Sequence, residues 1–177
     1  GEDLMLMFFT SGTTGYPKIA AHSYRYALGH YITAKYWHCV HADGLHFTIS
    51  ETGWGKALWG KLYGQWLCEG AVFTYDFDRF DASDILPMFL SRYDLSSIKH
   101  ATTAGEALNP EVFRQFEAQT GLQIYEGFGQ TETTLCIGNL IGNKQKIGSM
   151  GKPIPTYDLV LVDENDEPVA PGENGEI

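Results

Sequence analysis

Residues 4–18 read LMLMFFTSGTTGYPK, an unbroken apolar run that passes directly into a loop rich in glycine and hydroxyl side chains. The apolar run is six residues long and stops at this loop, so it predicts a buried strand rather than a helix. The loop carries two glycines, four hydroxyls and Lys18. Glycines let backbone amides approach a ligand closely, and lysine adds a mobile cation. The pattern is typical of a loop that holds polyphosphate, although a polar surface turn has the same composition.

A second segment of this kind follows a later predicted strand. Residues 125–134 read YEGFGQTETT and come directly after the apolar residues of a strand over 122–125. Phe128 between two glycines offers a flat ring to a base, and Thr131 offers a hydroxyl to phosphate. Glu132 supplies the hard oxygen ligand that Mg²⁺ prefers. A flexible loop with an exposed carboxylate is the alternative interpretation.

Strands and helices alternate along the rest of the chain, which indicates an α/β architecture. Helices are expected from Ser23 to Ile32, over 54–68, over 81–90, and from the Asn109 cap to Gly121. In the first of these helices, the apolar stripe Tyr24, Ala27, Leu28, Tyr31 and Ile32 should face the core. Further strands are expected over residues 45–49, 71–75, 98–103 and 157–162.

The charge of the chain is unevenly distributed. There are 12 basic and 22 acidic residues, for a formal charge of −10 at pH 7. Residues 1–75 hold five of each kind, whereas 158–177 hold seven acids and no base. An acidic surface repels nucleic acid and anionic lipid, so neither is expected as a partner. A site for an anionic ligand must therefore be built locally.

Cysteine usage and hydropathy bear on the cellular compartment. Cys39, Cys68 and Cys136 are odd in number and far apart, which predicts no disulfide framework. No signal peptide and no run of about 20 apolar residues is present. These features predict a reducing, cytoplasmic setting. His38, Cys39, His41 and His46 lie close together, but their spacing matches no structural zinc pattern.

Taken in order, the motifs resemble those of the adenylate-forming superfamily, which includes acyl- and aryl-CoA synthetases, luciferases and peptide-synthetase adenylation domains. The resemblance rests on TSGTTGYPK at 10–18, the Gly105-Glu106 pair and YEGFGQTETT at 125–134. ETGW at 51–54 and IGSMGKPIPTYDLVLVD at 147–163 look like the medium-chain acyl-CoA synthetase branch, close to acetyl-CoA synthetase-like proteins. The implied fold is part of the large N-terminal domain, a mostly parallel sheet with flanking helices.

This resemblance implies activation of a small carboxylic acid by ATP and Mg²⁺ to an acyl-adenylate, followed by transfer to CoA as co-substrate. Lys18 would hold the β- and γ-phosphates, Thr131 would contact the α-phosphate, and Glu132 would ligate Mg²⁺; these three are the catalytic candidates. Phe128 would stack on adenine opposite the backbone of residues 105–107. The nucleotide-binding set is completed by Thr10, Ser11, Gly12, Thr13, Thr14, Gly15, Gly105, Glu106, Ala107, Glu126, Gly127, Gly129 and Gln130.

The resemblance also indicates the size of the carboxylic acid that the protein would activate. Acetate-specific relatives place a tryptophan at the position of Gly129, so its absence here predicts a medium-chain, branched or aromatic acid. Trp54 would line the acyl or pantetheine path, or else be a core residue. Glu126 would contact the ribose or only shape its loop.

The resemblance also implies a domain organisation. Residues 1–177 would form a partial AMP-binding domain that lacks its N-terminal part and the C-terminal lid domain, and so would be inactive alone. The junction Phe89–Leu90 would be a deletion or an omitted loop. A non-catalytic nucleotide-binding relative and an adenylation domain that loads a carrier protein are the two alternatives.

Overall fold

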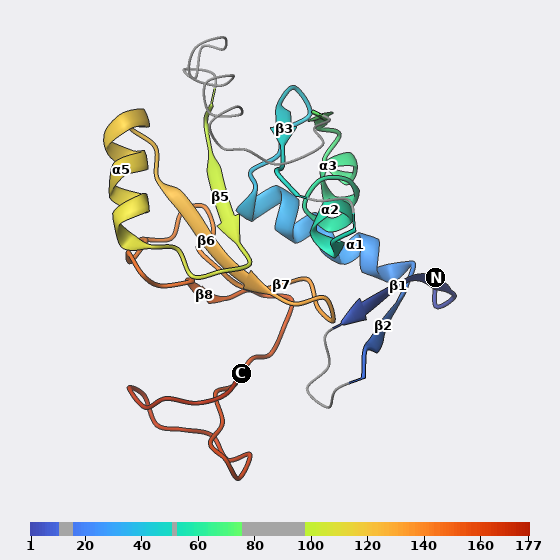
Figure 1. The fold of residues 1–177 in the computed structure, drawn as a ribbon, viewed down its shortest axis with the longest axis vertical. Coiled ribbons are helices and arrows are strands. Elements are labelled where there is room, and N and C mark those ends of the chain that lie inside the picture. The colour runs from blue at the N-terminus through green and yellow to red at the C-terminus, as the bar shows by residue number, and fades with distance from the viewer. Residues whose placement is uncertain (11–15, 51–52, 76–97) are drawn as a thin grey trace.

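The computed structural model describes residues 1–10, 16–50, 53–75 and 98–177 (Figure 1). The loop 11–15, the expected helix over 81–90 and the Phe89–Leu90 junction lie outside these residues. The strands are β1 (Leu4–Thr10), β2 (Lys18–Ser23), β3 (Leu45–Phe47), β4 (Ala71–Phe73), β5 (Ala101–Ala104), β6 (Ile124–Gly129), β7 (Leu135–Gly138) and β8 (Lys152–Pro153). The helices are α1 (Arg25–Ile32), which continues into the π-helical turn η1 (Thr33–Trp37), α2 (Gly55–Trp59), α3 (Tyr63–Leu67) and α5 (Pro110–Thr120).

The expected α/β class is confirmed, while the strand pairing is mixed rather than mostly parallel in the described residues. Strands β3 and β4 are parallel, and so are β5 and β6. The pairs β1–β2, β6–β7 and β7–β8 are antiparallel. Helix α5 lies on one side of β5 and β6, and helices α1 to α3 lie on the other (Figure 1).

The first strand forms where the sequence predicts it, but the prediction that it is buried is wrong. Phe9 is 79% exposed and Met7 59%. The reason is that, among the described residues, β1 pairs only with β2 in a two-stranded hairpin. The sequence did not indicate strand β2. The register places Thr10 opposite Lys18, so both ends of the glycine-rich loop meet at the base of that loop.

Helix α1 differs from the expectation in both its start and its buried face. It begins at Arg25, and the preceding Tyr24 makes no side-chain capping bond. The buried side chains are Tyr26 and His30, whereas Leu28 from the predicted stripe is 62% exposed. Burial of His30 lowers its pKa to about 3, so the imidazole is neutral in the folded protein.

Helix α5 closely follows its sequence signal. The Asn109 side chain accepts a hydrogen bond from the Glu111 amide at 2.9 Å, and proline occupies the first turn. Phe113 is buried in this helix, whereas Val112 is 51% exposed. The helix ends at Gly121, as the sequence predicts.

The end of the chain contains less regular structure than its alternating pattern suggests. The expected strand over 157–162 is wrong, because only Val162 forms isolated bridges, to Pro168 and Glu176. A turn follows at Asp163. The Asp163 carboxylate accepts hydrogen bonds from two following backbone amides, which lower the pKa of that carboxyl.

A small core holds the central sheet against the helices. Trp37, Leu135 and Ile154 are each only 1% exposed and pack together. Because Leu135 lies in β7 and Trp37 ends η1, this core fixes β6 and β7 relative to the α1 side. The loop between β6 and β7 contains Thr131 and Glu132, so the core also positions these two residues.

Candidate active site

One cavity of about 840 Å³ lies where the hairpin, the α2 segment and the central sheet meet. Its volume falls within the roughly 300–1,000 Å³ typical of small-molecule sites. Strand β1, α2, the end of β5 and the β6–β7 loop all contribute to its walls. Several of the site residues predicted from distant parts of the sequence therefore meet around one space.

One wall of the cavity collects oxygen groups and a cation. Thr10 and Lys18 come from the base of the hairpin, and Gln130, Thr131 and Glu132 come from the β6–β7 loop. More than 100 residues separate the two groups in sequence. Hydroxyls, a lysine and a carboxylate around one space are the groups that a polyphosphate with a divalent cation requires.

The expected adenine contacts lie at one edge of the central sheet. Strands β5 and β6 are parallel with Ala104 opposite Gly127, so Gly105 and Phe128 follow at the same end. Gly105 lines the cavity, and its φ of 108° is a conformation that other residues rarely adopt. Glu106 and Ala107 are exposed next to it but do not line the cavity. Phe128 is half-buried in β6 opposite Ile137, also outside the lining.

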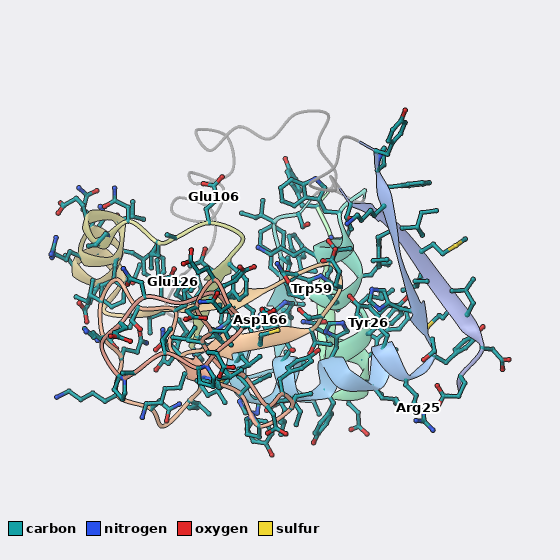
Figure 2. The ribbon with its side chains drawn as sticks, turned by 90° about the horizontal axis from the view of Figure 1, so that it is seen from below. Arg25, Tyr26, Trp59, Glu106, Glu126 and Asp166 are labelled. Atoms are coloured by element: carbon teal, nitrogen blue, oxygen red, sulfur yellow. The ribbon has the colours of Figure 1, made fainter. Side chains whose placement is uncertain are left out.

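Glu126 shapes the loop after β5. It is 5% exposed, and its Oε1 accepts a hydrogen bond from the Leu108 amide at 3.0 Å. Figure 2 shows Glu106 and Glu126 on the α5 side of the molecule, and Tyr26 and Trp59 on the α1–α3 side. Of the two roles considered for Glu126, this hydrogen bond supports the structural one.

Gly129 and Trp54, the two predicted substrate-pocket residues, both line the cavity. Trp54 is 64% exposed, so it does not belong to the core of the described residues. A Cβ atom at Gly129 would lie 2.5 Å from the Thr134 carbonyl oxygen, because the β6–β7 register shifts at this point. A side chain at this position therefore requires the backbone to move as well.

His22, which was not among the predicted site residues, connects the two halves of the oxygen-rich wall. Its Nε2–H donates to the Thr131 carbonyl oxygen at 2.7 Å. Its ring stacks on Tyr26, with the centroids 3.8 Å apart. Because His22 lies in β2, this bond holds the β6–β7 loop against the hairpin that carries Lys18.

We expect His22→Phe to weaken ATP binding by the full-length protein about five-fold, since one net hydrogen bond contributes roughly 1 kcal/mol. Phenylalanine keeps the stacking on Tyr26 and removes the donor to Thr131. The matched control is His41→Phe, because His41 is exposed. Calorimetric titration with ATP measures the effect, and unchanged affinity of His22→Phe would show that this bond does not position the site.

Lys56 and Trp59 of α2 are among the cavity residues that the sequence did not indicate as site residues. Lys56 is partly buried, and burial lowers its pKa. Neither of the two ion pairs found between described residues includes Lys56. A lysine between apolar residues forms no recognisable motif, so only the three-dimensional structure indicates this residue.

The remaining histidines near the cavity are held by protein groups. His38 Nδ1 lies 2.9 Å from the Thr102 hydroxyl, and His46 Nε2 lies 2.9 Å from the Gly60 carbonyl oxygen. His100 Nε2–H donates to the Trp37 carbonyl oxygen at 2.6 Å. Burial lowers the pKa of all three, so they are expected to be neutral near pH 7.

The structure is an α/β domain with one cavity formed by several of its elements. The oxygen-rich wall of this cavity adjoins a part that contains Trp54 and Trp59. A profile of the family described as AMP-binding enzyme matches residues 76–177, more than half of the chain. The chain belongs to this family.

Two relatives in other organisms agree with this assignment. The acyl-coenzyme A synthetase ACSM3 of Mus musculus is 37% identical over 199 residues, covering 99% of this chain and 34% of that protein. ACSM4 of Homo sapiens is also 37% identical, with the same coverage. The chain thus spans about a third of the length of these relatives. Both relatives are mitochondrial, which contradicts the cytoplasmic setting predicted from the sequence.

Solved structures agree with the fold. An acyl-CoA synthetase from Brucella canis superposes with a TM-score of 0.83 at 26% identity, covering 99% of this chain and 36% of that chain. The anthranilate CoA ligase AuaEII, solved with anthranoyl-AMP, gives a TM-score of 0.83 at 27% identity, covering 98% of this chain and 38% of that chain. Within the described part of the chain, every helix is too short or too polar to cross a bilayer.

Proposed function

We propose that the protein to which this chain belongs is an AMP-forming acyl-CoA synthetase: it activates a carboxylic acid with ATP and transfers the acyl group to CoA. The observation that carries the proposal is the meeting of Thr10 and Lys18 with Thr131 and Glu132 around one cavity. Family membership and the two CoA ligase structures support it. ATP and the acid are both anions, so catalysis rests largely on positioning and charge neutralisation.

On this proposal the oxygen-rich wall holds the triphosphate. The amides and hydroxyls of residues 10–15 bind the β- and γ-phosphates together with Lys18, which neutralises charge as pyrophosphate leaves. Thr131 donates its hydroxyl to the α-phosphate. Glu132 fits a magnesium ligand, because its carboxylate is exposed at the cavity and makes no ion pair with a described residue. Bound Mg²⁺ would supply charge stabilisation on the phosphates.

The remaining site residues contact either the adenine of ATP or the carboxylic acid. On this proposal, one side of the adenine faces the backbone of Gly105, Glu106 and Ala107, and the other side faces Phe128. Both segments follow the paired residues Ala104 and Gly127, at the same end of β5 and β6. Trp54 and the backbone of Gly129 bound the acyl compartment. The lack of a side chain there favours acids longer than acetate.

The extent of the domain is also part of the proposal. Residues 1–177 contribute the phosphate and adenine contacts of a larger AMP-binding domain, and further groups for the reaction come from elsewhere in the protein. The 199 aligned positions exceed the 177 residues of the chain by 22, so the relatives contain segments with no counterpart here.

The size of the acyl compartment gives a direct prediction. We expect the full-length protein to form CoA thioesters from pentanoate or benzoate with at least about ten-fold higher kcat/KM than from acetate, because each buried methylene contributes roughly 0.8 kcal/mol. Thioester product is measured by chromatography with ATP, CoA and a series of acids. Faster turnover of acetate than of pentanoate would contradict the account of Gly129.

The same assay separates the alternatives. A thioester with free CoA excludes an adenylation domain that needs a carrier protein. ATP binding without acid-dependent release of pyrophosphate would instead indicate a non-catalytic nucleotide-binding relative.

A further inference from the structure

Lys56 is a cation at the cavity that the proposed reaction does not use. The lining contains two lysines, and Lys18 is accounted for by the phosphates. Among the described residues of the lining, Glu132 is the only acidic one, and Lys56 forms no ion pair with it. Lys56 therefore lines the cavity with no opposite charge from the described residues.

Lys56 lies in α2, whereas the oxygen-rich wall is formed by the hairpin and the β6–β7 loop. It follows Trp54 and Gly55 on the wall formed by α2, where the indole of Trp59 also lies. Its Cγ is within 3.3 Å of where a Cβ of Gly60 would be, so the chain lies along the end of α2. This is the same side of the cavity as Trp54, which the proposed function assigns to the acyl compartment.

The surroundings of Lys56 are polar. Lys56 contributes to lowering the pKa of His38, after burial and after His46. The rings of His38 and His46 lie 5.0 Å apart. A histidine side chain is either neutral or cationic, so neither ring supplies a negative charge to Lys56. A purely apolar acyl tail in this region would leave a partly desolvated ammonium group unpaired, which is unfavourable.

We propose that Lys56 recognises a second anionic group on the acid, so that the preferred substrate carries a carboxylate, or a comparable acceptor, at the end remote from the reacting carboxyl. The inference rests on the proposed function, because it names the substrate of the same site. The ammonium group forms a charge-assisted hydrogen bond with the remote carboxylate, which orients the acid and balances the charge of Lys56.

The test compares two acids of equal length, glutarate and pentanoate, with the full-length protein. Wild type is expected to use glutarate with at least about ten-fold higher kcat/KM, since a charge-assisted hydrogen bond contributes roughly that factor or more. Lys56→Met should lower kcat/KM for glutarate about ten- to a hundred-fold, mainly through KM, and leave pentanoate unchanged or improved. Lys56→Arg should restore part of the preference. Lys61→Met is the matched control, because Lys61 lies outside the cavity lining.

The outcomes are distinct. Equal losses with both acids, or a raised KM for ATP or CoA, would overturn the inference and assign Lys56 to another ligand. Use of pentanoate but not glutarate by wild type would overturn it while leaving the proposed function intact. If no acid supports release of pyrophosphate, the proposed function fails, and this inference fails with it. The melting temperature of Lys56→Met, expected to stay at or above that of wild type, excludes misfolding as the cause.

Discussion

Glu132→Gln is expected to lower acid-dependent pyrophosphate release by the full-length protein roughly 10²- to 10³-fold, since a lost magnesium ligand weakens several kcal/mol of charge stabilisation. Glutamine keeps the length of the side chain but replaces a carboxylate oxygen with a neutral amide oxygen. The required Mg²⁺ concentration should rise in parallel. Rates measured over a range of Mg²⁺ concentrations check both expectations.

The control for this substitution is Glu164→Gln, an exposed carboxylate in the turn after Asp163. It removes the same charge from the protein at a position away from the cavity lining. Because Glu132 is exposed and has no ion pair with a described residue, its loss should not change the melting temperature. A Glu132→Gln enzyme with the wild-type rate and Mg²⁺ requirement would remove Glu132 from the site.

Trp37→Ala is expected to reduce the free energy of unfolding by about 3–5 kcal/mol, the usual cost of removing a large buried aromatic side chain. Trp37 is 1% exposed and packs on Leu135 and Ile154. Its ring also contacts β6, because a Cβ added at Gly127 would lie 2.8 Å from Trp37 Cζ2. The substitution opens a void beneath the two strands that carry the β6–β7 loop. Urea unfolding of the full-length protein measures the change.

The matched control is Trp66→Ala, because Trp66 in α3 is 63% exposed. Its loss should change the free energy of unfolding by less than about 0.5 kcal/mol. The two variants differ only in the burial of the same residue type. If Trp37→Ala and Trp66→Ala lost equal free energies of unfolding, Trp37 would not be part of the core that supports the site.

Local signals in the sequence were sufficient where the structure depends on nearby residues. Asn109 and Pro110 start a helix through the backbone groups that they cap or lack, so α5 could be predicted from a few residues. The interpretation of the glycine-rich segments as ligand loops rests on their residue types and stays a prediction. Thr10 and Lys18 at the ends of the first segment line the same cavity as Thr131 and Glu132 of the second.

Features that depend on distant partners could not be predicted in the same way. Strand β2 is defined by pairing with β1, and its own residues show no clear alternation. Residues 157–162 do alternate, but no strand in the described part of the chain pairs with them beyond the bridges at Val162. Both the predicted stripe and the buried residues of α1 have helical spacing, and packing against α3 and η1 selected the face with His30.

The uneven charge of the chain is consistent with the position of the cavity. Residues 1–75, in which acids and bases balance, supply Lys18 and Lys56 to its walls. The acid-rich residues 158–177 do not line it. An anion site can therefore exist in a chain whose formal charge is −10.

The most direct test of the central claim is exchange of labelled pyrophosphate into ATP by the full-length protein, with and without a carboxylic acid. If the cavity forms an acyl-adenylate, exchange requires both Mg²⁺ and the acid and does not require CoA. Exchange should rise in the presence of the acid and return to background when the acid is omitted. Tight ATP binding with no acid-dependent exchange, across acids that include pentanoate, glutarate and benzoate, would contradict the account.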